Sequence, residues 1–330
     1  MWSPKAACIG PIKIVDLRRI DKFEGRAVRM KGQDWALLFL LSIFWGGSFF
    51  FGAVAVREVP PLTLVALRTG IATLTLLAIL RIRGETLPIA RGTVAAFAVM
   101  GLLNNLLPFS LLFWALTAIP SGLASILNAT TPIFSIVVAH FVLADERMAK
   151  NKVVGILFGF AGVVVLVGRD AVGSADIASL GVLACLCAAL SYGFAGVFGR
   201  RFKAMHLSAT QVAFGQLFAS TILALPLVFA LDTPWRQTLP SAAAIGSVLA
   251  LAIVSTALAY AIFFRVLASA GAVNVALVTL LVPVSAILLG TLILSENLVW
   301  QHFMGMGLIG IGLLAIDGRV LGRFGRTVRS

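Results

Sequence analysis

From Asp34 to Ile316 the chain is a series of ten long apolar segments separated by short polar ones. Each is about 17 to 26 residues long, which suits a helix that crosses the hydrocarbon core of a bilayer. In lipid every backbone polar group must find its partner within the structure, and at these lengths that favours helices. The expected spans are Asp34–Val56, Leu62–Leu80, Gly92–Thr117, Ser121–Leu143, Lys152–Gly168, Leu180–Gly199, Ser208–Leu231, Ala242–Leu267, Ala272–Leu294 and Val299–Ile316.

The composition agrees with this interpretation and excludes a soluble fold. Of 330 residues, 60% are hydrophobic and only 12% are charged,. We therefore expect an all-α polytopic membrane protein with ten transmembrane helices. The net charge of +13 indicates attraction to anionic membrane lipids and not to nucleic acid, because no soluble domain carries it,.

The basic residues predict how the chain threads through the membrane. With the N-terminus inside, 22 of the 26 lysines and arginines fall on the inner side. Only Arg57, Arg169 and Arg236 fall outside, and Arg68 lies within a span. This asymmetry predicts a multi-pass protein of the cell (inner) membrane with both termini in the cytoplasm.

Two basic segments flank the spans. Residues 1–33 are expected to form a cytoplasmic N-terminal segment with a weakly amphipathic pattern, and residues 317–330 a cytoplasmic tail,. The alternative is that translation begins at Met30.

The spans divide into two similar halves of five, residues 34–168 and 177–316. An offset of 147 residues relates the first two spans of each half, and an offset of 151 relates the next two. Because five is odd, the second half enters the membrane upside down, which is typical of secondary transporters. The matched residues are Trp45-Gly46 with Tyr192-Gly193, Asn105 with Thr256, Phe109 with Tyr260, Phe113 with Phe264, and Pro132 with Pro283.

These features together resemble the drug/metabolite transporter superfamily of EamA type. The resemblance rests on Trp45-Gly46, Pro60-Pro61 with Arg68 seven residues later, the mid-span prolines Pro132 and Pro283, and Glu146 and Glu296 before glycine-rich helices. It implies a ten-helix inner-membrane carrier, commonly an exporter of amino acids or other small metabolites, with a central cavity. The chain departs from a symmetric pattern where Gly215 stands opposite Arg68 and where Asn297 follows Glu296.

Polar and aromatic residues near the middle of the spans are the candidates for substrate binding, because a substrate leaving water needs replacement hydrogen bonds. The alternative to substrate binding is, for the polar residues, a hydrogen bond between helices, worth about 0.6 kcal/mol. For Trp45 and Tyr192 the alternative is packing. The candidates are Trp45, Arg68, Asn104, Asn105, Asn128, Tyr192, Ser255, Thr256 and Tyr260.

Arg68 is the one charged residue deep in a span, and burial there costs about 2.5 to 3.5 kcal/mol,. It needs partners, and we expect backbone carbonyls, the asparagines Asn104, Asn105 and Asn128, or an anionic group of the substrate. The alternative is a structural anchor, or a side chain that reaches the outer surface.

Three other features have expected roles. Pro132 and Pro283 are predicted to kink their helices as hinges, with packing as the alternative. Glu146 and Glu296 are predicted to cap the helices that follow them. Glycines in the fifth and tenth spans favour close helix packing, with a homodimer face as a further possibility.

The sequence therefore predicts a secondary transporter that exports an amino acid or another small metabolite by alternating access. Its partners are the substrate and membrane lipids; no cofactor, metal or nucleic acid is expected. The alternatives are a channel or a non-transporting scaffold. A membrane enzyme is disfavoured, because His140, His206 and His302 all lie near span ends and form no catalytic or metal-binding set,.

Overall fold

The protein is described by a computed structural model that covers residues 31–87, 90–143, 150–167, 176–234, 238–275 and 277–317. In these residues the regular structure is helical, and each predicted apolar span coincides with helix to within about three residues at its ends. The helices of the first half are α2 Gly32–Ala55, α3 Pro61–Ile82, α4 Arg91–Gly101, η2 Leu102–Leu106, α5 Leu107–Ala115, α6 Ser121–Asn128, α7 Thr131–Val142 and α8 Lys150–Val167. Those of the second half are α9 Ile177–Gly199, α10 Arg201–Ala204, α11 Ala209–Leu227, η3 Val228–Asp232, α12 Ala242–Leu249, η5 Ala250–Leu258, α13 Ala259–Ala270, α14 Ala272–Val275, α15 Val278–Leu294 and α16 Trp300–Asp317.

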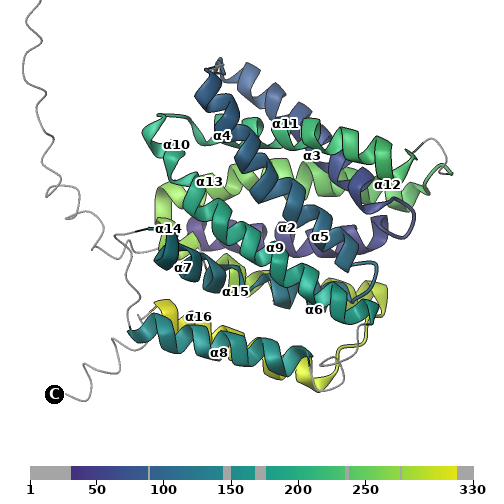
Figure 1. The fold of residues 1–330 in the computed structure, drawn as a ribbon, viewed down its shortest axis with the longest axis vertical. Helices are drawn as coiled ribbons and strands as arrows, with labels where there is room; N and C mark the ends of the chain where they lie inside the picture. Colours follow the sequence, from purple (N-terminus) through teal and green to yellow (C-terminus); the bar gives the residue numbers. More distant parts are fainter. Residues whose placement is uncertain are drawn as a thin grey trace, which may run out of the picture.

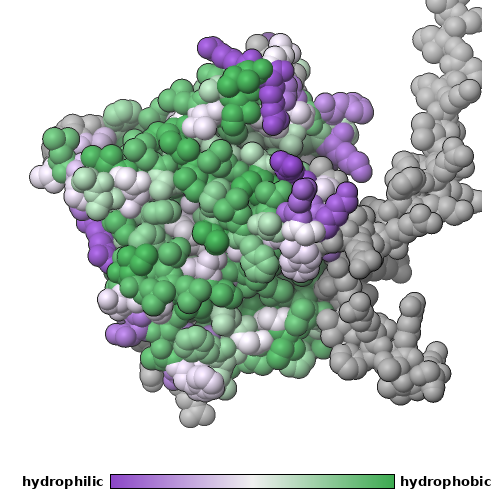
Figure 2. All heavy atoms as spheres, turned by 180° about the vertical axis from the view of Figure 1, so that it is seen from behind, coloured by the Kyte–Doolittle hydropathy of each residue, from purple (hydrophilic) through white to green (hydrophobic). Residues whose placement is uncertain are grey.

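Length and hydropathy identify a polytopic membrane protein. Seven continuous helical stretches are long and apolar enough to cross a bilayer, and three shorter apolar helices, Asn151–Leu166, Val278–Leu294 and Trp300–Ile316, accompany them. The surface is mostly hydrophobic, with hydrophilic residues gathered toward its edges (Figure 2). Large apolar side chains such as Phe141 and Leu292 are each 79% exposed on it, as expected where lipid is the solvent.

The helices pack in a bundle with one separate pair. α8 and α16 run along each other below the other helices in Figure 1. Within the main group, α2 packs on α15, α7 and α5 pack on α9, and α3 packs on α11. The buried centre of the molecule is therefore shared between elements from both halves of the chain.

Glycines allow the closest helix crossings. A Cβ on Gly46 of α2 would lie 2.7 Å from Ser285 Oγ and 2.9 Å from the backbone nitrogen of Ala286 in α15. A Cβ on Gly193 of α9 would lie 3.1 Å from the backbone of Phe134 and Ser135 in α7. The glycine that follows Trp45 and the one that follows Tyr192 thus each allow two helices to pack closely.

Two apolar segments depart from α-helical geometry at their centres. The third contains the π-helical turn η2, and the eighth contains the longer π-helical stretch η5. π-Helical turns are rare and are found mostly at functional sites. Here they lie at the positions that the offset of 151 residues relates, so both halves carry the same distortion.

The two mid-span prolines have different surroundings. α6 ends at Asn128 and α7 begins at Thr131 with Pro132 in its first turn, so the helix is interrupted there. Pro283, by contrast, lies inside α15, which runs without interruption from Val278 to Leu294. The matched proline pair therefore coincides with a helix break in one half only.

Candidate functional site

Arg68 of α3 is buried at the centre of the bundle and is only 6% exposed. Its Nε donates to Thr256 Oγ1 of η5 at 2.9 Å. The guanidinium carbon lies 3.8 Å from the centroid of the Phe109 ring and 5.6 Å from that of Phe113, both on α5, which are distances for cation–π attraction. The side chain therefore points inward and does not reach the outer surface.

One part of the prediction for Arg68 was wrong, namely that asparagines are its hydrogen-bond partners. None of the asparagines Asn104, Asn105 and Asn128 bonds to it; the hydroxyl of Thr256 does. Among the residues that the structure describes, this is the only hydrogen bond of the guanidinium, and no carboxylate lies within ion-pair distance. Its two terminal amino groups remain free to bind something else.

The π-helical stretch η5 orients Thr256. The Thr256 hydroxyl donates to the carbonyl of Leu251, five residues earlier, at 2.7 Å. This spacing is that of the π-helical hydrogen bond itself. The oxygen is thereby held where Arg68 Nε meets it.

A second group of polar side chains, partly buried, joins the two halves next to Arg68. The Nδ2 of Asn104, in η2, donates to Gln216 Oε1 of α11 at 3.0 Å and to the Tyr260 hydroxyl of α13 at 3.2 Å. Gln216 is 2% exposed. Tyr260 follows Thr256, the partner of Arg68, by four residues in the same span, so the two groups are neighbours.

Gln216 is a functional candidate that the sequence interpretation missed. The repeat offset relates Arg68 to Gly215, so it gave no reason to consider Gln216, the next residue. The available signal was that Gln216 is an amide in the middle of an otherwise apolar span. A buried amide must be hydrogen-bonded, so it marks a polar contact between helices.

Several other candidates are buried without a hydrogen-bond partner. Both side-chain amide atoms of Asn105 are unpaired although the residue is 0% exposed. The Ser255 hydroxyl and the Asn128 Oδ1 are also buried and unpaired. Unsatisfied polar atoms cost free energy and are rare in folded proteins, so these are positions where a ligand or water gains hydrogen bonds.

Trp45 lies apart from the arginine. Its ring packs on Phe263 of α13 with the centroids 5.5 Å apart. The structure thus brings together Arg68, Thr256, Asn104 and Tyr260, whereas Trp45, Asn128, Tyr192 and Ser255 make no hydrogen bond or ring contact to that group among the described residues.

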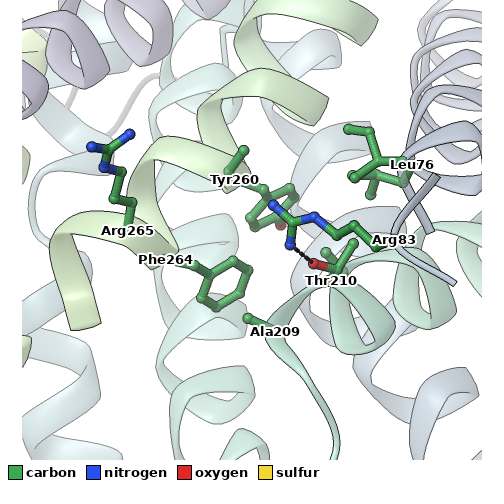
Figure 3. Close-up of a pocket in the computed structure, with 10 residues that line it drawn as sticks. Leu76, Arg83, Ala209, Thr210, Tyr260, Phe264 and Arg265 are labelled. Carbon is green, nitrogen blue, oxygen red and sulfur yellow. Dashed lines mark hydrogen bonds between the residues drawn. The ribbon is translucent and has the colours of Figure 1, made fainter. Parts of the chain in front are cut away.

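A pocket of about 230 Å³ opens beside this group, between α3, α11 and α13. Arg83 donates to Thr210 Oγ1 at 3.1 Å (Figure 3). It also lies 3.9 Å from the Glu85 carboxylate. Arg265 lines the pocket from another helix, and Tyr260 belongs both to its wall and to the Asn104 group. The pocket therefore leads from the bundle end that holds Arg83 toward the buried polar centre.

At the opposite end of the bundle, where α6 and α12 begin (Figure 1), three carboxylates accept hydrogen bonds from other spans. Asp232 accepts from the amide and hydroxyl of Thr63 at 2.6 and 2.8 Å. Glu58 accepts from the amide and hydroxyl of Ser241 at 2.6 and 2.7 Å. Each carboxylate ties the end of one span to the first turn of a distant one, where N–H groups favour an anion.

Glu296 makes the third of these contacts and corrects a prediction. It does not cap the helix that follows it. Its two oxygens accept from the amides of Ser121 and Gly122, at 2.8 and 3.1 Å, and so cap α6. Glu146, which was assigned the same role in the first half, lies outside the described residues.

The site contains no set of metal ligands: the described residues include no cluster of three histidine, cysteine or acidic side chains. What it offers is one buried cation with free donors, aromatic faces around it, and unpaired amide and hydroxyl groups. This chemistry suits reversible binding of a small polar molecule.

Sequence comparison decides the family. The EamA-like transporter family matches residues 35–168 and again residues 179–316. The chain belongs to this family. This EamA-like transporter is 30% identical to the uncharacterized transporter YoaV of Bacillus subtilis, over 83% of the chain and 92% of YoaV.

Two relatives come from Escherichia coli K12. The uncharacterized inner membrane transporter YedA is 29% identical, over 84% of this EamA-like transporter and 89% of YedA. A protein described as a probable amino-acid metabolite efflux pump is 28% identical, over 86% of the chain and 94% of that protein. The names of the relatives indicate transporters and not enzymes.

A solved crystal structure shares the fold, with a TM-score of 0.64 and 22% identity, over 89% of this chain and 99% of the other. The EamA-like transporter is thus a multi-pass membrane protein of established fold type.

Proposed function

We propose that this protein is a secondary transporter that exports a small metabolite across the cell (inner) membrane by alternating access. In this proposal ten spans form two inverted repeats, residues 34–168 and 177–316, and both termini are cytoplasmic. The end that holds Arg83 faces the cytoplasm, as the asymmetry of basic residues predicts.

Contacts between helices support the inverted repeat. α2 packs on α15 through Gly46, and α9 packs on α7 through Gly193, and the two contacts are equivalent under the repeat offset. The π-helical stretches η2 and η5 are equivalent in the same way. The family itself matches once in each half.

One observation supports the alternating-access mechanism: the two ends of the bundle differ. A pocket with Arg83 and Tyr260 in its wall lies at the proposed cytoplasmic end, whereas Asp232, Glu58 and Glu296 join spans at the other end. Carboxylates also join spans at the cytoplasmic end, where Asp34 accepts from Ser269 and Glu85 accepts from Ser208. In this proposal the structure represents an inward-facing carrier. Outward opening requires the three carboxylate contacts at the outer end to break while the cytoplasmic pocket closes.

The direction of transport and the kind of substrate are supported by the efflux-pump relative, which is described as acting on amino-acid metabolites. The binding site in this proposal is made by Arg68, Asn104, Asn105, Thr256 and Tyr260. Trp45, Asn128, Tyr192 and Ser255 line the path that the substrate takes, and the break at Pro132 serves as a hinge.

The test is a comparison of extracellular metabolites from cells that lack the protein and cells that overproduce it. We expect at least one small metabolite to accumulate outside with the wild type and not with Thr256→Val or Asn105→Leu. Gly307→Ala is the control, because a Cβ there meets nothing within 4 Å. Export profiles that are identical in all strains would contradict the proposal.

Transport measurements with the same metabolite then distinguish a carrier from a channel. In proteoliposomes a carrier exchanges labelled for unlabelled substrate and saturates, whereas a channel conducts without exchange. Saturable exchange is the expected result.

A further inference from the structure

We infer that the substrate bound at Arg68 is an organic monoanion, a carboxylate on an aromatic or apolar body without an ammonium group, and that its transport moves net charge. This inference rests on the proposed function and narrows it, because it selects a class of metabolite that excludes free amino acids.

The free part of Arg68 fits a carboxylate. Nε is engaged by Thr256, and the two terminal amino groups have no hydrogen-bond partner among the described residues. A guanidinium presents its donors in a planar fork that matches the two oxygens of a carboxylate. A carboxylate that approaches the terminal groups therefore completes the hydrogen bonding of Arg68.

Charge balance selects a monoanion. Among the residues that the structure describes, Arg68 is the one buried charge near the middle of a span. The acidic residues of the sequence lie in polar segments or at span ends, where Asp34, also 6% exposed, accepts from Ser269. A bound monoanion makes the site neutral, whereas a zwitterion leaves one positive charge and a dianion leaves one negative charge. Because an uncompensated charge is costly in a low-dielectric interior, the neutral complex is the one that crosses most readily.

The surroundings of Arg68 fit an apolar or aromatic body. The ring centroids of Phe109 and Phe113 lie 3.8 and 5.6 Å from the guanidinium carbon. Rings prefer offset or edge-to-face contact with other rings. An aromatic carboxylate therefore places its charge on the arginine and its ring among these side chains.

The cytoplasmic pocket also carries two basic side chains. Arg83, which lies 3.9 Å from the Glu85 carboxylate, and Arg265 line it together with Tyr260 (Figure 3). Their guanidinium groups attract an anion to this end of the bundle.

The proposal explains why no acidic proton carrier is present in the spans. A potential of about 100 mV, negative inside, favours outward distribution of a monoanion about 50-fold. Export of an anion needs no coupled proton, because the membrane potential drives it.

The experiment compares four compounds that share one ring. These are 3-phenylpropionate, phenylalanine, phenethylamine and phenylsuccinate, which are a monoanion, a zwitterion, a cation and a dianion at neutral pH. Currents are recorded from proteoliposomes on a solid-supported membrane, with protein-free liposomes as blank. We expect a saturable current of negative sign with 3-phenylpropionate only.

The variants assign that current to Arg68. Arg68→Gln is expected to lower the current at least about 30-fold, while Arg68→Lys, which keeps the charge but not the fork, retains part of it. Arg81→Gln, an exposed arginine of the same helix, is the matched control and keeps the full current. Thermal unfolding in detergent verifies that each variant is folded.

Two outcomes would overturn the inference. One is no saturable current with 3-phenylpropionate; the other is an equal current after Arg68→Gln in a folded variant. Saturable uptake of labelled phenylalanine without current would also overturn it, yet would leave the transporter function standing. Failure of the export test described above would instead remove the function itself.

Discussion

At the scale of single residues, the buried centre depends on amides and hydroxyls that hold one another. Asn104 bonds to both Gln216 and Tyr260, and so links η2 to α11 and α13. Replacing Gln216 by Leu leaves the half-buried Asn104 with one partner, which is expected to destabilise the fold by about 1 kcal/mol,. Thermal unfolding in detergent measures this, and Gln301→Leu on the exposed face of α16 is the control. Equal stability of both variants would show that the Asn104 contact is not important for the fold.

A titratable residue offers a second test at this scale. The hydrogen bonds from the Ser241 hydroxyl and amide hold the pKa of the Glu58 carboxyl below its usual value. A lowered pKa in the folded state means that the contact stabilises the protein above the usual carboxyl pKa. That stabilisation is lost as the pH falls through the lower, folded-state pKa.

The measurement follows from that sign. The difference in thermal stability between wild type and Glu58→Gln is expected to be largest near neutral pH and to narrow as the pH falls below about 4.5. A difference that stays constant from pH 7 to pH 4 would be inconsistent with the charged contact.

The sequence predicts the burial of such residues better than it predicts their hydrogen-bond partners. The burial of Arg68 followed from its depth in an apolar span. Its partner did not, because the direction in which Thr256 points depends on the rotation of its helix, and that rotation is set by packing. The same reason explains why Gln216 was missed although its polarity was visible.

At the scale of elements, the α8–α16 pair tests how tightly the helices are packed. A Cβ on Gly312 would lie 2.5 Å from the carbonyl oxygen of Gly155 and 2.9 Å from the backbone nitrogen of Gly159. Gly312→Ala must therefore push the two helices apart, with an expected loss of about 1–3 kcal/mol. Gly310→Ala is the matched control two residues away, because its Cβ meets nothing within 4 Å.

The control has its own expected direction. Alanine is a better helix former than glycine, so Gly310→Ala is expected to leave stability unchanged or slightly raised. The same thermal unfolding assay reads both variants. If Gly312→Ala were as stable as Gly310→Ala, the close crossing of α8 and α16 would be refuted.

The elements themselves were predictable and their distortions were not. Hydropathy located the apolar helices, because the membrane requires long apolar segments in helical form. The π-helical stretches η2 and η5 have no such signature: Leu102–Leu106 and Ala250–Leu258 contain residues that α-helices also accept. The hydrogen-bond register there is decided by the neighbouring helices, as is the difference between Pro132 and Pro283.

At the scale of the whole molecule, the inverted repeat predicts on which side of the membrane equivalent positions lie. Arg57, after the first span, and Ala204, after the sixth, are related by the offset of 147 residues and are both exposed. In a protein without Cys8, Cys185 and Cys187, we expect a thiol at Arg57→Cys to react with an impermeant maleimide in intact cells. A thiol at Ala204→Cys is expected to react only after the cells are permeabilised. Labelling of both from the same side would rule out the inverted arrangement.

The division into halves was visible in the sequence because it rests on pairs of residues, such as Trp45-Gly46 and Tyr192-Gly193. The contacts at the ends of the spans, such as that of Glu296 with Gly122, were not visible, because they join residues that are far apart in the sequence. No local pattern encodes such a contact.

The hydroxyl of Thr256 has a single proton, and its own helix uses it: the proton goes to the Leu251 carbonyl. The oxygen can then accept hydrogen bonds but donate none. It therefore repels a negatively charged substrate and binds only a hydrogen-bond donor such as Arg68. An anion must therefore approach the guanidinium from the side opposite Thr256. The guanidinium can then bind the anion and the Thr256 hydroxyl at the same time.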